Sequence, residues 1–150
     1  MTMHETVVIT RDFSHHLSVI FRAFSTPEIV QKWLAPDGFS CSEVVQDLRV
    51  GGRMHTHFVD ADGNSAISEG SYTMIVPNSV IAYKFWVQYG EIKLEDLTTT
   101  ITFESIEGGT RVTAELQVSQ PEFAEGCIIG WNQSLDNLTT LLGSSSRLQD

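Results

Sequence analysis

The sequence predicts an α+β fold in which a curved antiparallel sheet of about seven strands wraps around a long C-terminal helix, with two short helices after the first strand. Three observations predict it. Apolar and polar residues alternate between positions 40 and 118, which is typical of strands. Only a few turn residues separate most of these runs. Such connections are too short to join parallel strands, which need a crossover of about a dozen residues or more. The last apolar run, by contrast, has helical spacing.

The first third of the chain holds a strand and two helices. Residues Glu5–Phe13 alternate and predict the first strand. A helix is predicted over residues 17–24, with Ser14 as its expected N-cap. A second short helix lies within residues 25–38, where Thr26 can act as the cap.

Six further strands are predicted from the period-two pattern, and their ranges are 40–48, 53–59, 66–76, 80–87, 97–106 and 110–118. The segment "DADGN" at residues 60–64 is interpreted as a hairpin turn and not as a calcium loop, because the closing Glu of an EF-hand is missing from its register. The segment "WVQYGEIKLEDL", residues 86–97, is either a mobile lid or a longer hairpin.

The C-terminal helix is predicted to begin at a capping box, Ser119 to Glu122, and to stop at Gly143. Gly inside a helix costs roughly 1 kcal/mol relative to Ala, which suggests a structural reason for Gly130. We expect that its lack of a side chain lets this helix approach the sheet closely. Residues 144–150 are expected to form a flexible tail, and residues 1–150 a single domain. The apolar stripe consists of Ala124, Cys127, Ile128, Trp131, Leu135, Leu138 and Leu142.

Charge and composition exclude several classes of function. The formal net charge is −10, which disfavours nucleic acids and anionic membrane surfaces as partners. The sequence has neither an apolar run long enough to span a bilayer nor a signal-peptide pattern, so the expected location is the cytoplasm. Cys41 and Cys127 lie in no metal-binding or redox spacing and are expected to be reduced thiols.

Few residues suggest chemistry. His55 and His57 would lie on one face of a strand, as a metal site requires, but no third ligand is identifiable, and the outer, solvated side of the sheet is the favoured position. Asp47 and Arg49 are expected to form a structural pair near Gly51. No nucleophile motif is present, and no cofactor or metal is implied.

An ordered set of segments resembles one family. They are "VIFRAFSTPEIVQKWLAP" from Val19, "DLRVGGRM" from Asp47, "EGSYTMIVPNSVIAYKF" from Glu69, "TITF", "EGGTRVT" and "GWNQSLDNL" from Gly130. Together they resemble the START-like (SRPBCC) superfamily with its helix-grip fold, in the branch similar to the activator of heat-shock-protein ATPase. Family members often have Gly where this chain has Ala35, which puts the turn at the rim of the expected cavity in doubt.

The resemblance implies a deep, mostly apolar cavity between the sheet and the C-terminal helix, of the kind that other members use to bind hydrophobic molecules. Tyr72, which shares a face with Gly70 and Met74, and Tyr83 are expected to point inward, where a phenol either orients a ligand or bonds to a neighbouring backbone group. The candidate ligand-binding residues are Trp33, Met54, Phe58, Tyr72, Tyr83, Phe85, Trp131 and Leu135.

Three functions remain open at this point. The first is a non-enzymatic protein that binds a small hydrophobic ligand in the cavity. The second is an enzyme of the cyclase or aromatase kind, which a buried carboxylate beside a Tyr would favour. The third is a protein-interaction module with a chaperone partner, by family analogy, which a large exposed apolar patch would favour. A homodimer is also left open.

Overall fold

The computed structural model describes residues 5–143, so the predicted tail at 144–150 lies outside the described residues. The elements follow the predicted order, with one short 3-10 helix added before the last helix. They are β1 (Glu5–Phe13), α1 (Leu17–Ser25), α2 (Pro27–Trp33), β2 (Phe39–Gln46), β3 (Arg53–Asp60), β4 (Ser65–Val76), β5 (Val80–Tyr89), β6 (Ile92–Ile106), β7 (Gly109–Val118), η1 (Pro121–Phe123) and α3 (Ala124–Gly143).

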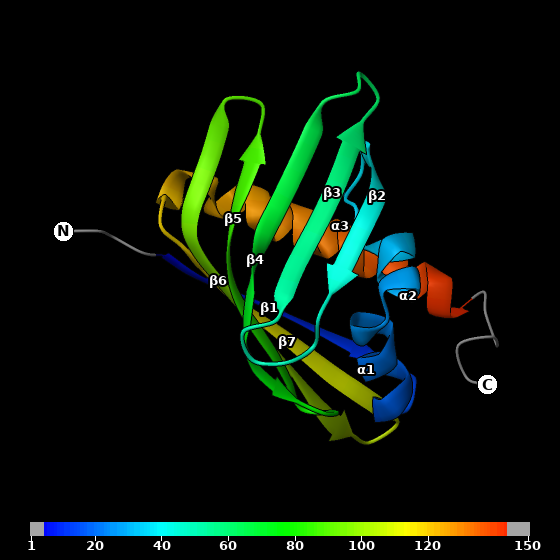
Figure 1. The fold of residues 1–150 in the computed structure, drawn as a ribbon. Helices are drawn as coiled ribbons and strands as arrows, with labels where there is room; N and C mark the ends of the chain where they lie inside the picture. The colour runs from blue at the N-terminus through cyan, green and yellow to red at the C-terminus, as the bar shows by residue number, and fades with distance from the viewer. Residues whose placement is uncertain (1–4, 144–150) are drawn as a thin grey trace.

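The seven strands form one antiparallel sheet in the order β1-β7-β6-β5-β4-β3-β2. Figure 1 views the sheet from its outer face, with α3 crossing behind β3, β4 and β5 and with α1 and α2 beside the sheet near one end of α3. The α+β helix-grip prediction is therefore confirmed. The segment 86–97 is a longer hairpin and not a separate lid, because β5 and β6 pair up to Tyr89 and Ile92.

Two helix starts differ from the prediction. The cap of α1 is His16 and not Ser14: the His16 Nδ1 accepts a hydrogen bond from the Ser18 backbone N–H at 3.1 Å. The capping box at Ser119 does not form, because the Ser119 hydroxyl donates instead to the carbonyl of Glu95 at 2.7 Å. Residues Pro121–Phe123 then form the 3-10 turn before α3 begins.

The two halves of α3 differ in how they pack. Leu135, Leu138 and Leu142 are buried in the core, whereas Ile128, on the predicted stripe, is 40% exposed. The expectation of a close approach at Gly130 is wrong, because a Cβ added there would meet no atom within 4 Å. Around Gly130, α3 is therefore not packed tightly against the sheet, although Ala124 at the start of the helix is buried.

The second half of α3 is fixed to the segment that follows α2. The Ser134 hydroxyl donates to the carbonyl of Leu34 at 2.6 Å, and the Asn137 amide donates to the carbonyl of Ala35 at 3.0 Å. The positive-φ residues of the described chain other than Gly are Asn78 and Asp96, so an Ala fits at position 35 without strain. These bonds hold α3 over the sheet.

A β-bulge in β4 changes which side chains face inward. Tyr72 pairs with Tyr83, but the next pair joins Met74 to Ala82, so the register shifts by one residue between them. Tyr72 is buried, while Met74 is exposed on the outer face, so the prediction that they share a face is wrong. No helix among residues 5–143 is long and apolar enough to cross a membrane.

Candidate functional site

A cavity of about 260 Å³ lies between the N-terminal half of α3 and the inner face of the sheet. Cys127, Gly130, Trp131 and Ser134 of α3 form one wall, and Leu34 and Pro36 close one side. The opposite wall is the sheet, which contributes Met54, Thr56, Phe58, Ser68, Tyr83, Phe85, Val87, Leu94, Leu97, Thr99 and Leu116. We call this the outer cavity.

A smaller inner cavity of about 50 Å³ adjoins it, deeper beneath α2. Its wall includes Trp33, Gln46 and Tyr72, which do not line the outer cavity. Residues common to both walls form the boundary between the cavities: Leu34, Met54, Thr56, Tyr83 and Trp131. A ligand in the outer cavity would therefore meet Tyr83 and Trp131 at its inner end.

Seven of the eight predicted site residues line one or both of these cavities. The eighth, Leu135, is 1% exposed and belongs to the hydrophobic core, and it lines neither cavity. Trp33 is in the inner wall, but its indole N–H is already bonded to the carbonyl of Ala23 at 3.0 Å. It therefore offers a ligand only the surface of its ring.

The titratable groups of the outer cavity are neutral at physiological pH. Burial raises the pKa of Tyr83 to about 12, so its phenol keeps its proton. Burial also raises the pKa of the Cys127 thiol. In the inner cavity, burial raises the pKa of Tyr72, and the neighbouring Tyr83 adds to the shift. These phenols can donate or accept hydrogen bonds but cannot serve as anionic bases near pH 7.

The Thr99 hydroxyl is buried within the sheet side of the outer wall. Its Oγ1 has no surface open to the cavity, and a hydrogen bond from the Thr99 side chain to Tyr83 partly offsets the rise in the pKa of that phenol. Buried hydroxyls are normally bonded in this way. The Thr99 hydroxyl is thus part of the wall and is not presented to a molecule in the cavity.

Comparison with known proteins places this geometry in a family. The family model for "Activator of Hsp90 ATPase homolog 1-like protein" (AHSA1) matches residues 14–143, which include both helices after β1, every cavity-lining residue and α3. The chain belongs to this family. No curated protein matches it.

Several solved structures share the AHSA1-like fold. A Chromobacterium violaceum protein is 32% identical, with a TM-score of 0.80 and coverage of 91% of this chain and 95% of the other. An uncharacterized protein from Rhizobium leguminosarum is 30% identical, with a TM-score of 0.83 and coverage of 97% and 98%. An AHSA1-like protein from Aeromonas hydrophila, at 19% identity, shares the fold with a TM-score of 0.78 and coverage of 93% of each chain.

Sequence reasoning missed several wall residues of this AHSA1-like protein, Thr99 and Gly130 among them. Thr99 could have been found, because it alternates in phase with Leu97 and Ile101, which are buried on the inner face of β6. Gly130 could not, because helical spacing identifies a face but gives no distance from that face to the sheet.

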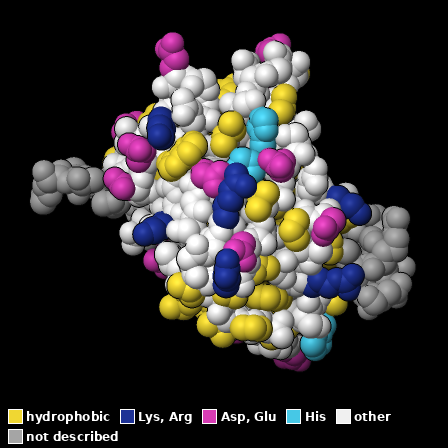
Figure 2. Space-filling view, in the orientation of Figure 1, with side chains coloured by type: hydrophobic (Ala, Val, Ile, Leu, Met, Phe, Trp, Pro, Cys, Tyr) yellow, Lys and Arg dark blue, Asp and Glu magenta, His cyan; other side chains and the backbone are white. Residues whose placement is uncertain are grey.

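The ring nitrogens of His55, in the predicted H-x-H pair, contact acidic side chains of the neighbouring strands, although His55 also borders the inner cavity. His55 is not solvated as expected: it is 8% exposed, with its Nε2 3.0 Å from Glu43 and its Nδ1 2.8 Å from Glu69. Arg53 adds a bidentate pair to Glu69. Figure 2 shows these His, acidic and basic side chains gathered over β2–β4. No group of three metal-binding side chains occurs in residues 5–143. The contacts of His55 and Arg53 with Glu43 and Glu69 link the neighbouring strands β2, β3 and β4.

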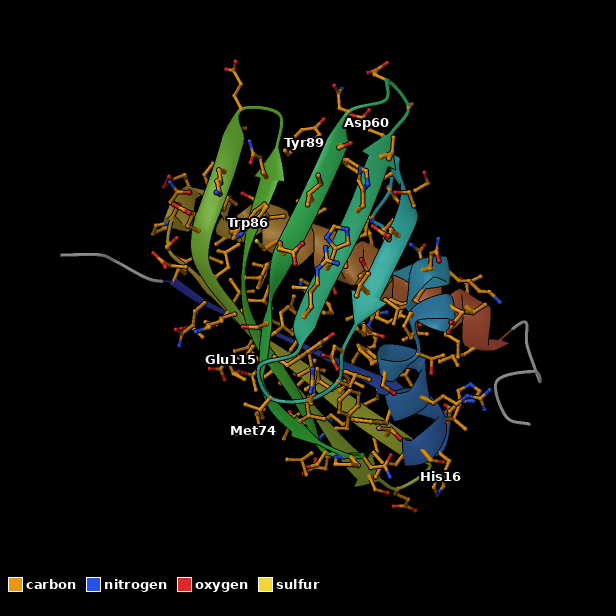
Figure 3. The ribbon with its side chains drawn as sticks, viewed as in Figure 1. His16, Asp60, Met74, Trp86, Tyr89 and Glu115 are labelled. Carbon is orange, nitrogen blue, oxygen red and sulfur yellow. The ribbon has the colours of Figure 1, made fainter. Side chains whose placement is uncertain are left out.

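The tips of two hairpins beside the outer cavity are joined. The Tyr89 hydroxyl at the end of β5 donates to the Asp60 carboxylate at the end of β3 at 2.9 Å, and Figure 3 shows the two side chains near the hairpin tips. Asp60 also accepts from the backbone N–H groups of Asp62 and Asn64, which confirms a hairpin turn at residues 60–64. The strands that carry Phe58 and Val87 are thereby held together.

Proposed function

We propose that this AHSA1-like protein binds a small hydrophobic molecule in the outer cavity. The observation that carries the proposal is the composition of the wall: aromatic and aliphatic side chains surround a few polar groups, as in sites for small ligands. The volume of about 260 Å³ is close to the lower end of such sites, which favours a compact ligand.

The separation of α3 from the sheet supports the same function. A helix with a filled core beneath it would bring its apolar stripe into contact with the strands along its whole length. Here the contact is close around Leu135 and Leu138 but open at Gly130, and the opening lies over Tyr83 and Phe85. Cys127 and Trp131, which belong to the apolar stripe predicted from the sequence, therefore line the outer cavity.

The two alternative functions have less support. An enzyme of the cyclase or aromatase kind was expected to place a carboxylate beside an inward Tyr, yet among the described residues that line either cavity there is no Asp or Glu. The interaction module, with a chaperone or a second copy as partner, stays a prediction from family analogy. The described residues include exposed apolar side chains such as Met74 and Ile129 on different elements.

The test combines native mass spectrometry of the purified protein with organic extraction of bound molecules, and compares two variants. Gly130→Leu adds a side chain that enters the outer cavity, whereas Gly126→Leu adds the same side chain to an exposed position of α3 that lines neither cavity. Each variant removes a helix-interior Gly and should gain up to about 1 kcal/mol of helix stability.

We expect an extractable hydrophobic molecule with the wild type and the Gly126→Leu variant and none with Gly130→Leu. Since both variants should remain folded, a loss of ligand cannot be attributed to unfolding. The proposal fails if the wild type carries nothing and its melting temperature does not respond to a panel of lipids and aromatic compounds.

A further inference from the structure

We infer that Met54 sets the upper limit on the length of the ligand, because its side chain closes the outer cavity off from the inner one. This inference rests on the proposed function and makes the ligand a compact, ring-sized molecule without a long alkyl chain. The inner cavity is then a latent extension of the site, which a smaller side chain in place of Met54 would open.

Met54 lies where the two cavities meet. It is near the start of β3, lines both cavity walls, and is only 6% exposed. Its partners on the neighbouring strands are Gln46 of β2 and Gly70 of β4. Because Gly70 has no side chain, β4 places nothing beside Met54 at this level of the sheet. The closure between the cavities therefore depends on the Met54 side chain.

Other residues of this boundary are fixed by their own contacts. The Tyr83 ring packs against the rings of Tyr72 and Phe85, with centroids 5.9 and 5.2 Å apart. The carbonyl of Leu34 accepts a hydrogen bond from the Ser134 hydroxyl at 2.6 Å. A Met side chain is unbranched and carries neither a ring nor a strong hydrogen-bonding group. Its replacement therefore opens the boundary while these other contacts stay in place.

The inner cavity has the size and the lining that suit an alkyl chain. Its volume is about 50 Å³, whereas an engineered apolar cavity of about 150 Å³ binds benzene, so the inner cavity has no room for a ring. The outer cavity, at about 260 Å³, does have that room. The inner wall includes the buried apolar side chains of Phe24, Val30, Ile81 and Ile101. An unbranched chain that extended past Met54 would therefore lie against apolar surface.

The limit can be measured as the chain length at which binding stops improving. Straight-chain alcohols from butanol to decanol are suitable probes, because the hydroxyl favours water while the chain favours the apolar cavity. Each methylene group that becomes buried should strengthen binding about fourfold, whereas methylenes added after the chain has reached Met54 gain nothing. Calorimetric titration of the delipidated wild type should show an affinity that rises with chain length and then reaches a plateau.

Two variants locate the residue that causes the plateau. Met54→Ala joins the cavities, so its plateau should begin at chains about two methylenes longer, and the longest alcohols should bind about 15-fold more tightly than to the wild type. Phe58→Ala is the matched control, because it removes a larger side chain that lines the outer cavity but not the inner one. It should widen the site without lengthening it, so its plateau should begin at the wild-type chain length.

A measurement on the wild type does not depend on how well the variants fold. In methyl NMR spectra of protein labelled at methionine, the Met54 signal, assigned with a Met54→Leu variant, should shift when an alcohol of plateau length binds. Met74 is 50% exposed on the outer face of β4 and lines neither cavity, so its signal should stay in place.

The outcomes separate the two proposals. The assignment of the limit to Met54 is wrong, while a hydrophobic site remains, if the plateau of Met54→Ala matches that of the wild type or if Phe58→Ala moves it as far. The same holds if a bound alcohol leaves the Met54 signal unchanged. If no alcohol binds and the native protein yields no extractable molecule, the proposed function fails, and the length limit fails with it.

Discussion

Replacing Leu135 by Ala tests whether this residue belongs to the core or to the ligand site. The sequence places it on the same helical stripe as Trp131, but the structure buries it to 1% exposure, outside both cavity walls. A buried Leu→Ala change typically lowers the free energy of unfolding by about 2–5 kcal/mol, because it removes apolar contacts and leaves a void. With a central value of about 3 kcal/mol and about 2–4 °C per kcal/mol for a chain of this size, the melting temperature should fall by about 6–12 °C.

The control is Ile128→Ala, two turns earlier on the same stripe. Ile128 is 40% exposed, so its removal should change the free energy of unfolding by no more than about 0.5 kcal/mol. The stability of both variants would be measured by urea and thermal unfolding. Each variant would also be titrated with the molecule extracted from the wild type or with an aromatic compound that binds the wild type. We expect Leu135→Ala to be less stable, with unchanged affinity once the measurement is made well below its melting temperature.

The reasoning is refuted by the opposite pattern. If Leu135→Ala costs less than about 1 kcal/mol and weakens binding at least tenfold, this side chain would contact the ligand and the cavity would extend further along α3 than the structure indicates. An equal loss of stability in the two variants would likewise contradict the difference in packing between the halves of α3.

Three further predictions concern the sheet. Gly70→Ala should lower the free energy of unfolding by more than 2 kcal/mol in urea melts, on the order of an overpacked core change, since its Cβ would lie 2.0 Å from the backbone carbonyl oxygen of Lys84. The Arg53 hydrogen bonds hold the pKa of Glu69 below its ordinary value of 4.5, so the stabilising contribution of this carboxylate is present above about pH 4.5 and is lost as the pH falls through the lowered pKa. Glu69→Gln should flatten that part of the curve of stability against pH, and an unchanged curve would contradict this. Thr110→Val should lower the free energy of unfolding by about 1–2 kcal/mol in thermal melts, because it removes the hydrogen bond that the buried Thr110 hydroxyl donates to the carbonyl of His15 at 2.8 Å.

Periodicity was sufficient for the architecture. The alternation within Glu5–Phe13 and along the later strands identified all seven, because a strand that is buried on one face must alternate. The pattern did not show which residue would cap each helix, because several side chains compete for the same backbone groups. Ser14 and Ser119 are good cap residues, yet His16 caps α1 and the Ser119 hydroxyl bonds to a carbonyl of β6. The bulge after Tyr72 was also missed, since it adds a residue without changing the composition.

The candidate site was predictable only as a set of inward faces. Met54, Phe58 and Tyr83 follow from alternation, and the structure places them in a cavity wall. Whether the space between two apolar faces is filled depends on how far apart the backbones lie, and that distance is set by bonds from distant residues, such as Ser134 to Leu34. Leu135 and Trp131 therefore look equivalent in the sequence although one packs and the other borders a cavity.

The division of α3 has a consequence for how members of such a family can diverge. Residues around Leu138 anchor the fold, and their replacement risks its loss. Gly130 borders the outer cavity, and an added Cβ there would meet no atom within 4 Å, so a new side chain at this position would reshape the cavity at little cost to folding. One helix thus combines a segment that tolerates little change with a position that accepts a new side chain. If the proposed function holds, a change of ligand can arise from a substitution there while the scaffold stays intact.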